Sequence, residues 1–257
     1  MKFTISGISD PGKLRKINQD NFCCDGRIRD LILDRLTFDG EVNEDKGWLA
    51  AVFDGMGGEK FGEIASLLAA EATLKYCAMT EPPYDINSLI YDINSKLCDE
   101  IDLRMCTMGS TCVYLEFDGD KCRSWNLGDS RAYILHDGAL EQLSEDHTEA
   151  SSYRAVFGDA AVRLGSENRL TQHLGIPADD FIVEPYVSQW NTLEPGDLLL
   201  LCSDGLSHLV DDEDITAVMT SSSSIQEKRD QLLELALDNG GKDNVTIILF
   251  EAGDSDF

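Results

Sequence analysis

Residues 51–58 read A-V-F-D-G-M-G-G, an apolar run that breaks off into an aspartate and a group of glycines. Two other apolar runs carry an aspartate at one end: L-L-L-L-C-S-D-G at 198–205, and K-D-N-V-T-I-I-L-F at 242–250. Each run has the length and composition of a buried strand, so each places a carboxylate at a strand tip. Carboxylate oxygens are what a hard divalent cation binds. The pattern therefore predicts an enzyme that holds Mg²⁺ or Mn²⁺ and works on a phosphate.

The charge and composition of the chain limit its partners and its location. Its 257 residues include 48 Asp and Glu against 21 Lys and Arg, a formal net charge of −27. Nucleic-acid binding and binding to anionic membranes both depend on basic residues, so we expect neither partner. The chain shows no apolar signal segment and no run of the ~20 apolar residues that a membrane span needs. Eight scattered cysteines without a C-x-x-C pair favour reduced thiols, which predicts a cytoplasmic protein.

Strand-like and helix-like periodicities occur in groups along the chain. Alternating or continuous apolar runs predict strands at 2–9, 48–53, 110–117, 121–127, 132–135, 140–143, 181–187, 197–202 and 244–250. Helical spacing predicts helices at 62–79, 85–105, 212–220 and 225–238. Grouped strands with helix pairs between and after them are typical of an α+β protein, and two packed sheets with helices outside would bury every apolar face.

The chain shows no linker and no internal repeat. We expect one catalytic domain over residues 1–251, followed by a short, frayed acidic tail at 252–257. The segment at about 148–180 has weak periodicity and mixed charge, and we expect it to be a mobile surface insertion.

Each aspartate also has an ordinary structural interpretation. An isolated Asp-Gly pair such as Asp54-Gly55 or Asp204-Gly205 most often marks a simple turn. Asp129, in N-L-G-D-S-R, is equally explained by a tight turn with an aspartate–arginine pair. The interpretation as metal ligands depends on several such aspartates following apolar runs in one chain.

Eight short blocks, taken together and in order, resemble the metal-dependent type 2C serine/threonine protein phosphatases, particularly their compact bacterial members. The blocks are R-K-I-N-Q-D at 15–20, V-F-D-G-M-G-G at 52–58, G-E-I-A-S at 62–66, M-G-S-T at 108–111, N-L-G-D-S-R at 126–131, L-S-E-D-H-T at 143–148, C-S-D-G-L at 202–206 and K-D-N-V-T at 242–246. The resemblance implies a four-layer α-β-β-α sandwich of two antiparallel sheets flanked by helix pairs. It also implies a metal centre in a cleft between the two sheet edges.

The resemblance implies metal ligands position by position. Asp54 is expected to bridge two metal ions, with the carbonyl oxygen of Gly55 on one of them. Asp204 and Asp243 would complete the first metal site, and Asp20 would act on the metals directly or from behind the other ligands. Ligation mostly by aspartate and water predicts dependence on Mn²⁺ or Mg²⁺ and easy loss of the metal.

Two further roles follow from the same resemblance. Arg15 would grip the substrate phosphate, because a guanidinium offers two parallel donors to phosphate oxygens. Asp129, with Asp204, matches the pair that holds a third, weaker metal in bacterial members.

The implied reaction is direct attack of a metal-activated water on phosphoserine or phosphothreonine, without a phosphoenzyme. The implied partners are phosphorylated protein substrates of a serine/threonine kinase, and we expect a monomer.

This chain departs from the family where a proton donor is expected. Many members carry a histidine directly after the Asp-Gly pair, where this chain has Met56, and bacterial members often carry one after the double glycine, where it has Glu59. The acid that protonates the leaving alkoxide is therefore unassigned, with Glu59 and a metal-bound water as alternatives. His147, in E-D-H-T, is expected to be a structural, hydrogen-bonding histidine.

The insertion at about 148–180 matches the flap of the family, which lies beside the active site. Its arginines, Arg154, Arg163 and Arg169, either help to capture phosphorylated peptides or are ordinary solvated side chains.

Two other functions remain as alternatives. A pseudophosphatase that only binds would typically have lost a metal aspartate or the phosphate-gripping arginine, and this chain keeps both. A hydrolase of nucleotides or small phosphoesters is disfavoured because the chain has no G-x-x-x-x-G-K-[ST] loop.

Overall fold

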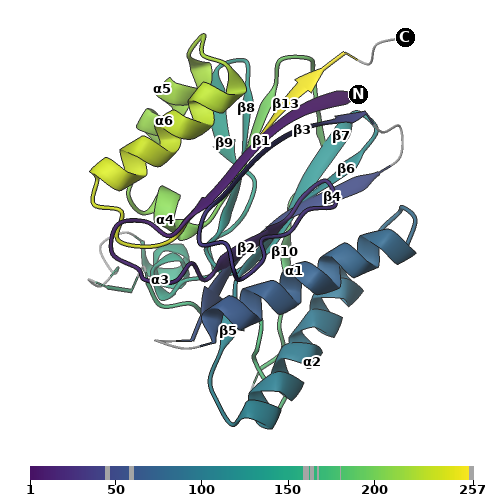
Figure 1. The fold of residues 1–257 in the computed structure, drawn as a ribbon, viewed down its shortest axis with the longest axis vertical. Coiled ribbons are helices and arrows are strands. Elements are labelled where there is room, and N and C mark those ends of the chain that lie inside the picture. Colours follow the sequence, from purple (N-terminus) through teal and green to yellow (C-terminus); the bar gives the residue numbers. More distant parts are fainter. Residues whose placement is uncertain are drawn as a thin grey trace.

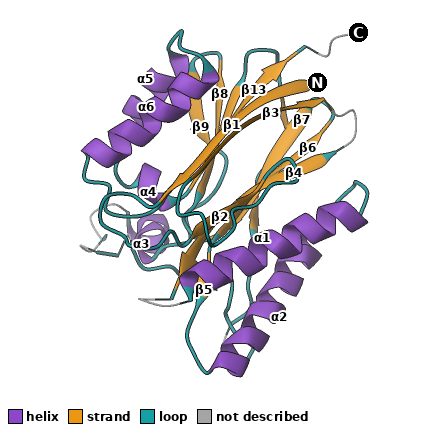
Figure 2. Ribbon diagram, viewed as in Figure 1, coloured by secondary structure: helices purple, strands orange, loops and turns teal. Residues whose placement is uncertain are grey.

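Two antiparallel sheets pack face to face, and a pair of helices covers the outer face of each (Figure 1). The computed structural model describes residues 1–43, 47–57, 61–158, 162, 165–166, 168–179 and 181–254. Figure 2 shows the strands gathered between the two groups of helices. The predicted α+β sandwich of four layers is confirmed.

The first sheet has six strands over the described residues. In spatial order they are β3 (Leu36–Asn43), β1 (Lys2–Asp10), β13 (Val245–Gly253), β12 (Leu198–Cys202), β8 (Arg131–His136) and β9 (Ala139–Gln142). Its outer face packs on α5 (Asp212–Thr220) and α6 (Ile225–Asp238). The short helix α4 (Asp204–Ser207) follows β12 directly at the end of this sheet.

The second sheet has seven strands over the same described residues. Its main path is β10 (Tyr186–Val187), β7 (Lys121–Leu127), β6 (Cys112–Asp118), β4 (Trp48–Met56) and β2 (Asp20–Cys23), with β11 (Asn191–Thr192) on β7 and β5 (Gly109–Ser110) on β4. Its outer face is covered by α1 (Gly62–Met79) and α2 (Ile86–Arg104).

The central strands are apolar on both faces because each sheet is buried on both sides. In β4, Ala50 and Val52 face the core between the sheets, whereas Leu49 and Phe53 pack beneath the helices. In β12, Leu199 and Leu201 face the core between the sheets, and their neighbours in sequence face α5 and α6. Burial on both faces explains why these strands read as continuous apolar runs rather than as alternating ones.

The structure differs from the predicted elements in several places. Strands β2, β3 and β11 and the short helix α4 were not expected. The strand expected at 181–187 is wrong for most of its length: Phe181 and Ile182 are exposed, and only Tyr186–Val187 pairs in the sheet. The insertion contains a helix, α3 (Glu149–Phe157), whose first turn is capped by the side chain of Thr148.

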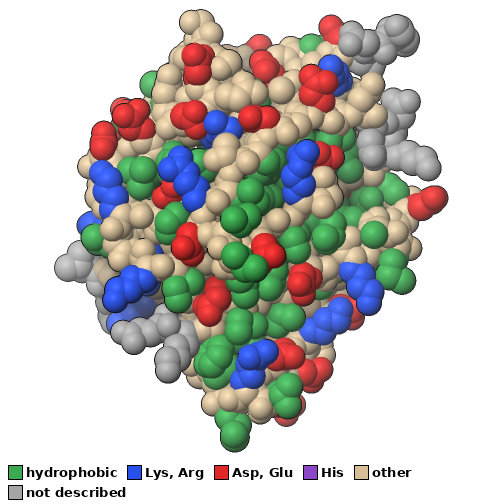
Figure 3. Space-filling view, in the orientation of Figure 1, with side chains coloured by type: hydrophobic (Ala, Val, Ile, Leu, Met, Phe, Trp, Pro, Cys, Tyr) green, Lys and Arg blue, Asp and Glu red, His purple; other side chains and the backbone are tan. Residues whose placement is uncertain are grey.

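The surface shows no single dominant patch of charge on the face drawn in Figure 3, where acidic, basic and apolar side chains are interspersed. Among the described helices, none combines the length and the apolar character required to cross a membrane.

Candidate metal centre

The strand ends bring four of the five predicted aspartates to one cavity of about 870 Å³, and the fifth, Asp20, lies behind its lining. Asp54 near the end of β4 pairs across the sheet with Asp20 at the start of β2. Asp204 opens α4 directly after β12, and Asp243 lies just before β13. Residues from both sheets thus meet at one edge of the sandwich. The predicted residues that line the cavity are Arg15, Asp54, Gly55, Asp129, Asp204 and Asp243.

Asp20 lies behind the cavity lining and is held in place by two hydroxyl groups. Its Oδ2 accepts hydrogen bonds from Ser203 Oγ at 2.6 Å and from Thr246 Oγ1 at 2.8 Å. Burial raises the pKa of Asp20 to about 7, although these two hydrogen bonds oppose the rise. Its Oδ1 atom is buried without a hydrogen-bond partner among the described residues. Asp20 therefore presents one satisfied and one unsatisfied oxygen.

The backbone around Asp54 is fixed by the next strands of the sheet. Its N–H donates to Thr111 Oγ1 at 3.0 Å, and its carbonyl accepts from the N–H of Thr111 at 2.9 Å. Burial raises the pKa of the Asp54 carboxyl well above its ordinary value, and the charges of Asp20 and Asp204 raise it further. Carboxylates crowded in this way favour either a shared proton or a bound cation.

The backbone of Gly55 lies against the first residue of α1, Gly62. A Cβ atom at this position would lie 2.0 Å from the carbonyl oxygen of Gly62, so no larger residue fits. The N–H of Gly55 donates to the carbonyl of Gln19 at 3.1 Å. The Asp-Gly pair is thus a packing requirement of this strand end and not a free turn.

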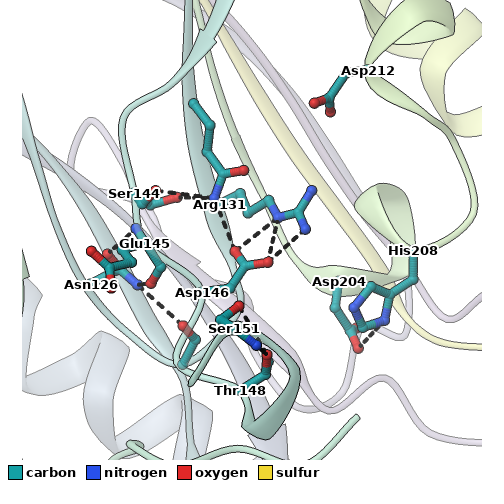
Figure 4. Close-up of polar contacts among 12 residues, drawn as sticks. Asn126, Arg131, Ser144, Glu145, Asp146, Thr148, Ser151, Asp204, His208 and Asp212 are labelled. Atoms are coloured by element: carbon teal, nitrogen blue, oxygen red, sulfur yellow. Dashed lines mark hydrogen bonds and ion pairs between the residues drawn. The ribbon is translucent and has the colours of Figure 1, made fainter. Parts of the chain in front are cut away.

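Asp129, Asp204 and His208 form a compact group of potential ligands. Each offers one ligand atom, and these atoms lie within 4.8 Å of one another. Figure 4 shows the imidazole of His208 beside Asp204, with Nδ1 3.2 Å from Oδ2. Asp129 is 5% exposed, and burial followed by the charge of Asp204 raises its pKa to about 7.

His208 also sets the charge state of Asp204. Burial raises the pKa of Asp204, but the net shift is downward, because the hydrogen bond and the charge of His208 oppose burial together with smaller effects of Asp54 and Arg15. The hydrogen bond that His208 donates to the Asp204 carboxylate in turn raises the pKa of His208. Asp204 is therefore the carboxylate of this group that stays ionised.

The ordinary interpretation of Asp129, an ion pair with its neighbouring arginine, does not hold. Arg131 instead pairs with Asp146, with Nη2 2.6 Å from Oδ2 (Figure 4). A second guanidinium nitrogen of Arg131 donates to the hydroxyl of Tyr133 at 2.9 Å. Asp129 consequently remains directed to Asp204 and His208.

Arg15 borders the cavity from the loop after β1. Its Nη2 donates to Asp243 Oδ2 at 2.6 Å, and this hydrogen bond raises the pKa of the guanidinium. The side chain remains about half exposed, at 47%. A charged, partly solvated guanidinium beside a carboxylate-lined cavity is suited to an anionic substrate.

The donor set fits a hard divalent cation. Asp204 Oδ1, like Asp20 Oδ1, is buried and lacks a hydrogen-bond partner among the described residues. An unpartnered buried carboxylate oxygen is costly unless a cation or a proton compensates it. Aspartate oxygens are the preferred ligands of Mg²⁺, and Mn²⁺ also accepts a nitrogen such as that of His208.

The remaining predicted residues lie outside this arrangement. His147 accepts a hydrogen bond at Nδ1 from the N–H of Gly128 at 3.3 Å, its burial lowers its pKa, and it does not line the cavity. Arg169 pairs with Glu149 at 3.4 Å. Glu59 and Arg163 lie outside the described residues.

Sequence reasoning missed two histidines that line the cavity, His208 and His173. His208 lies four residues after Asp204, a spacing that places both on one face of a helical turn. That signal was available in the sequence. His173 reaches the cavity through the tertiary fold, and nothing in its sequence context indicates it.

Comparison with known proteins places this chain in a family. Residues 34–238 match the family described as protein phosphatase 2C. The serine/threonine phosphatase stp of Listeria innocua is 29% identical over 255 residues, covering 95% of this chain and 93% of that protein. The serine/threonine protein phosphatase PstP of Mycobacterium tuberculosis is 32% identical over 225 residues, covering 81% of this chain and 41% of that protein.

Solved structures agree with this assignment. The crystal structure of the Mycobacterium tuberculosis phosphatase PstP has a TM-score of 0.79 at 27% identity and covers 99% of this chain and 100% of that one. A structure of the PstP catalytic domain in complex with two manganese ions gives the same TM-score, identity and coverage. The chain belongs to the protein phosphatase 2C family.

Proposed function

We propose that this chain removes phosphate from phosphoserine and phosphothreonine in proteins at the carboxylate-lined cavity between its two sheets. It is a metal-dependent serine/threonine phosphatase that uses Mn²⁺ or Mg²⁺. The observation that carries the proposal is the convergence of Asp20, Asp54 and Asp204 at one site, with two of their buried oxygens left without hydrogen-bond partners.

Each residue of the site has a proposed role. Asp54, together with the carbonyl of Gly55, would bind two cations, and Asp204 and Asp243 would complete the first site. Asp20 Oδ1, which is buried without a hydrogen-bond partner among the described residues, supports a role for Asp20 next to these metal ligands. Asp129 and Asp204 would hold a third, weaker cation, to which His208 adds a nitrogen ligand; their ligand atoms all lie within 4.8 Å of one another.

The reaction needs a nucleophile, a bound phosphate and a stabilised leaving group. Cations at such a site lower the pKa of a bound water and neutralise charge on the phosphoryl oxygens. The side chain of Arg15 is anchored through one Nη atom to Asp243, which leaves its other N–H groups to bind two phosphate oxygens. Anchoring of this kind orients the phosphate for in-line attack, and no residue needs to become phosphorylated.

The proposal also covers the substrates, the oligomeric state and the location of the protein. Its substrates would be phosphoproteins made by a serine/threonine kinase, and residues 1–251 would act as one catalytic domain and a monomer. The eight cysteines are unpaired, which suits a reducing compartment and supports a cytoplasmic location.

The test compares substrates under identical metal conditions. With Mn²⁺ present, kcat/KM is measured for a phosphothreonine peptide and for a nucleoside triphosphate. A preference for the peptide is expected, because the similar proteins are serine/threonine phosphatases and the sequence has no G-x-x-x-x-G-K-[ST] loop. A preference for the nucleotide would contradict the proposed substrate class.

A further inference from the structure

The cavity holds one imidazole that no carboxylate engages among the described residues. The chain has four histidines. His136 bonds to Asp197 and His147 bonds to Gly128, and neither lines the cavity. His208 lines the cavity but is paired with Asp204. His173 lines the cavity, and its hydrogen bond is to a backbone carbonyl.

The backbone around His173 is held rigidly on both sides. Leu174 forms a β-bridge with Ser110, in which each N–H donates to the carbonyl of the other, at 3.2 and 2.8 Å. The next residue, Gly175, donates its N–H to the side chain of Asn94 on α2 at 2.7 Å. His173 is therefore carried on a segment tied to both β5 and α2, which limits the movement of its ring.

The ring of His173 lies against Gly109 in strand β5. A Cβ atom on Gly109 would lie 3.0 Å from His173 Nδ1, so the absence of a side chain at Gly109 leaves room for the imidazole. Gly109 is in turn the cross-strand partner of Met56, which lies two residues after Asp54. The imidazole thus lines the same cavity as Asp54 and Met56, against a strand that pairs with the end of β4. Met56 itself has no proton to give.

The hydrogen bond of the ring determines which nitrogen exchanges protons. His173 Nδ1 lies 2.9 Å from the carbonyl oxygen of Leu174. A carbonyl oxygen only accepts, so Nδ1 carries the proton in this bond and Nε2 is left to take up or release another. A backbone carbonyl on one nitrogen is a usual means of orienting an imidazole that transfers protons through the other.

We propose that His173 is the general acid of the reaction, and this assignment rests on the proposed phosphatase function. As the water oxygen bonds to phosphorus, the P–Oγ bond of the phosphoserine or phosphothreonine breaks and its electron pair stays on Oγ. The proton on Nε2 of the His173 imidazolium moves to that Oγ, so the product leaves as an alcohol beside inorganic phosphate. The neutral imidazole regains its proton from solvent before the next turnover.

The test exploits the difference between good and poor leaving groups. His173→Asn places an amide nitrogen where Nδ1 was, so it keeps the donor to Leu174 but removes Nε2. We expect kcat for a phosphothreonine peptide to fall roughly 100-fold, within the usual range for loss of a general acid. Hydrolysis of p-nitrophenyl phosphate, whose leaving group needs no proton, should change by less than about threefold.

Matched controls separate this role from a structural one. His136→Gln alters an imidazole remote from the cavity and should leave both substrates unaffected. Mn²⁺ binding to His173→Asn, measured by calorimetry, should match the wild type. Across a series of aryl phosphates, log kcat of the variant should fall more steeply as the leaving group becomes more basic.

Three outcomes would overturn the assignment. Equal losses on both substrates would make His173 a structural residue, and unchanged peptide hydrolysis would give the proton to another donor such as a metal-bound water. Failure of the wild type itself to hydrolyse the peptide with Mn²⁺ would contradict the proposed function and the assignment together.

Discussion

Arg15 and Asp243 are joined by a hydrogen-bonded ion pair in which Nη2 of the arginine lies 2.6 Å from Oδ2 of the aspartate. The two residues are 228 positions apart in the sequence, and the pair links the loop after β1 to the loop before β13 at the rim of the cavity. It couples the group proposed to bind phosphate to a group proposed to bind metal. Substrate and cation would therefore be positioned by one connected set of side chains.

Replacing Arg15 should weaken the binding of phosphate. Arg15→Ala is expected to raise KM for a phosphothreonine peptide and the inhibition constant of inorganic phosphate by about tenfold or more, because the bidentate contact is lost. Arg15→Lys keeps the charge but not the planar fork, so it should restore only part of the affinity. Steady-state kinetics with phosphate as product inhibitor measures the KM and the inhibition constant of each variant. An unchanged inhibition constant in Arg15→Ala would exclude the proposed contact.

Removing the imidazole of His208 should affect the weaker metal site most. In His208→Gln we expect the weak class of Mn²⁺ site to be lost, because the group of Asp129, Asp204 and His208 loses a ligand. The tight sites should remain and weaken less, because His208 acts on them only through the charge of Asp204. Calorimetric titration of metal-stripped protein with Mn²⁺ measures the classes separately. His136→Gln serves as the matched control, and loss of the tight sites in His208→Gln would contradict this division.

The metal-free protein should lose stability as the pH rises from about 4 to about 7. The folded state raises the pKa of Asp20 from its ordinary 3.8 to about 7, so between these values the folded state binds a proton that the unfolded state has released. Stability is then complete at the acidic end and declines toward neutrality. Urea unfolding in the presence of EDTA, repeated across this pH range, measures how steeply the free energy of unfolding falls as the pH rises.

Two comparisons isolate the contribution of Asp20 to that slope. Asp20→Asn mimics the protonated carboxyl and should make the dependence on pH less steep, with the raised pKa values of Asp54 and Asp129 accounting for the part that remains. Excess Mn²⁺ should stabilise the wild type most at the neutral end. An identical slope in the wild type and in Asp20→Asn would show that Asp20 is not the titrating group.

A methyl group at Gly55 should disrupt the site and the fold together. Its Cβ would lie 2.0 Å from the backbone oxygen of Gly62, which cannot move aside without shifting the start of α1. We expect Gly55→Ala to lower the free energy of unfolding by about 1–3 kcal/mol, the range for overpacked sites, and to reduce activity. Gly253→Ala is the control, since its nearest neighbour would be 3.7 Å away. Equal stability of the two variants in urea would contradict the close approach.

The sequence allowed the core of this fold to be predicted because its central strands are buried on both faces. Continuous apolar runs such as those of β4 and β12 are recognisable without structural information. The ordered blocks around Asp54, Asp204 and Asp243 likewise predicted which side chains would meet. In the structure these three residues line one cavity.

Other features depend on tertiary contacts that leave little trace in the sequence. β3 contains Asp39-Gly40 and reads as a turn, but Asp39 is paired with Arg229 of α6 and the strand continues along β1. β2 spans only Asp20–Cys23, which is too short for an alternation of apolar and polar residues to be recognised in the sequence. His173 reaches the cavity because Leu174 pairs with Ser110, a contact between segments that no local pattern connects.

The most direct measurement is hydrolysis of a phosphothreonine peptide by metal-stripped protein as Mn²⁺ is added back, for the wild type and for Asp54→Asn. We predict that Mn²⁺ restores the wild-type activity, that EDTA abolishes it, and that Asp54→Asn stays lower by orders of magnitude while its circular dichroism spectrum is unchanged. Wild-type activity that persists in EDTA, or an Asp54→Asn variant as active as the wild type, would contradict a metal centre built on Asp54.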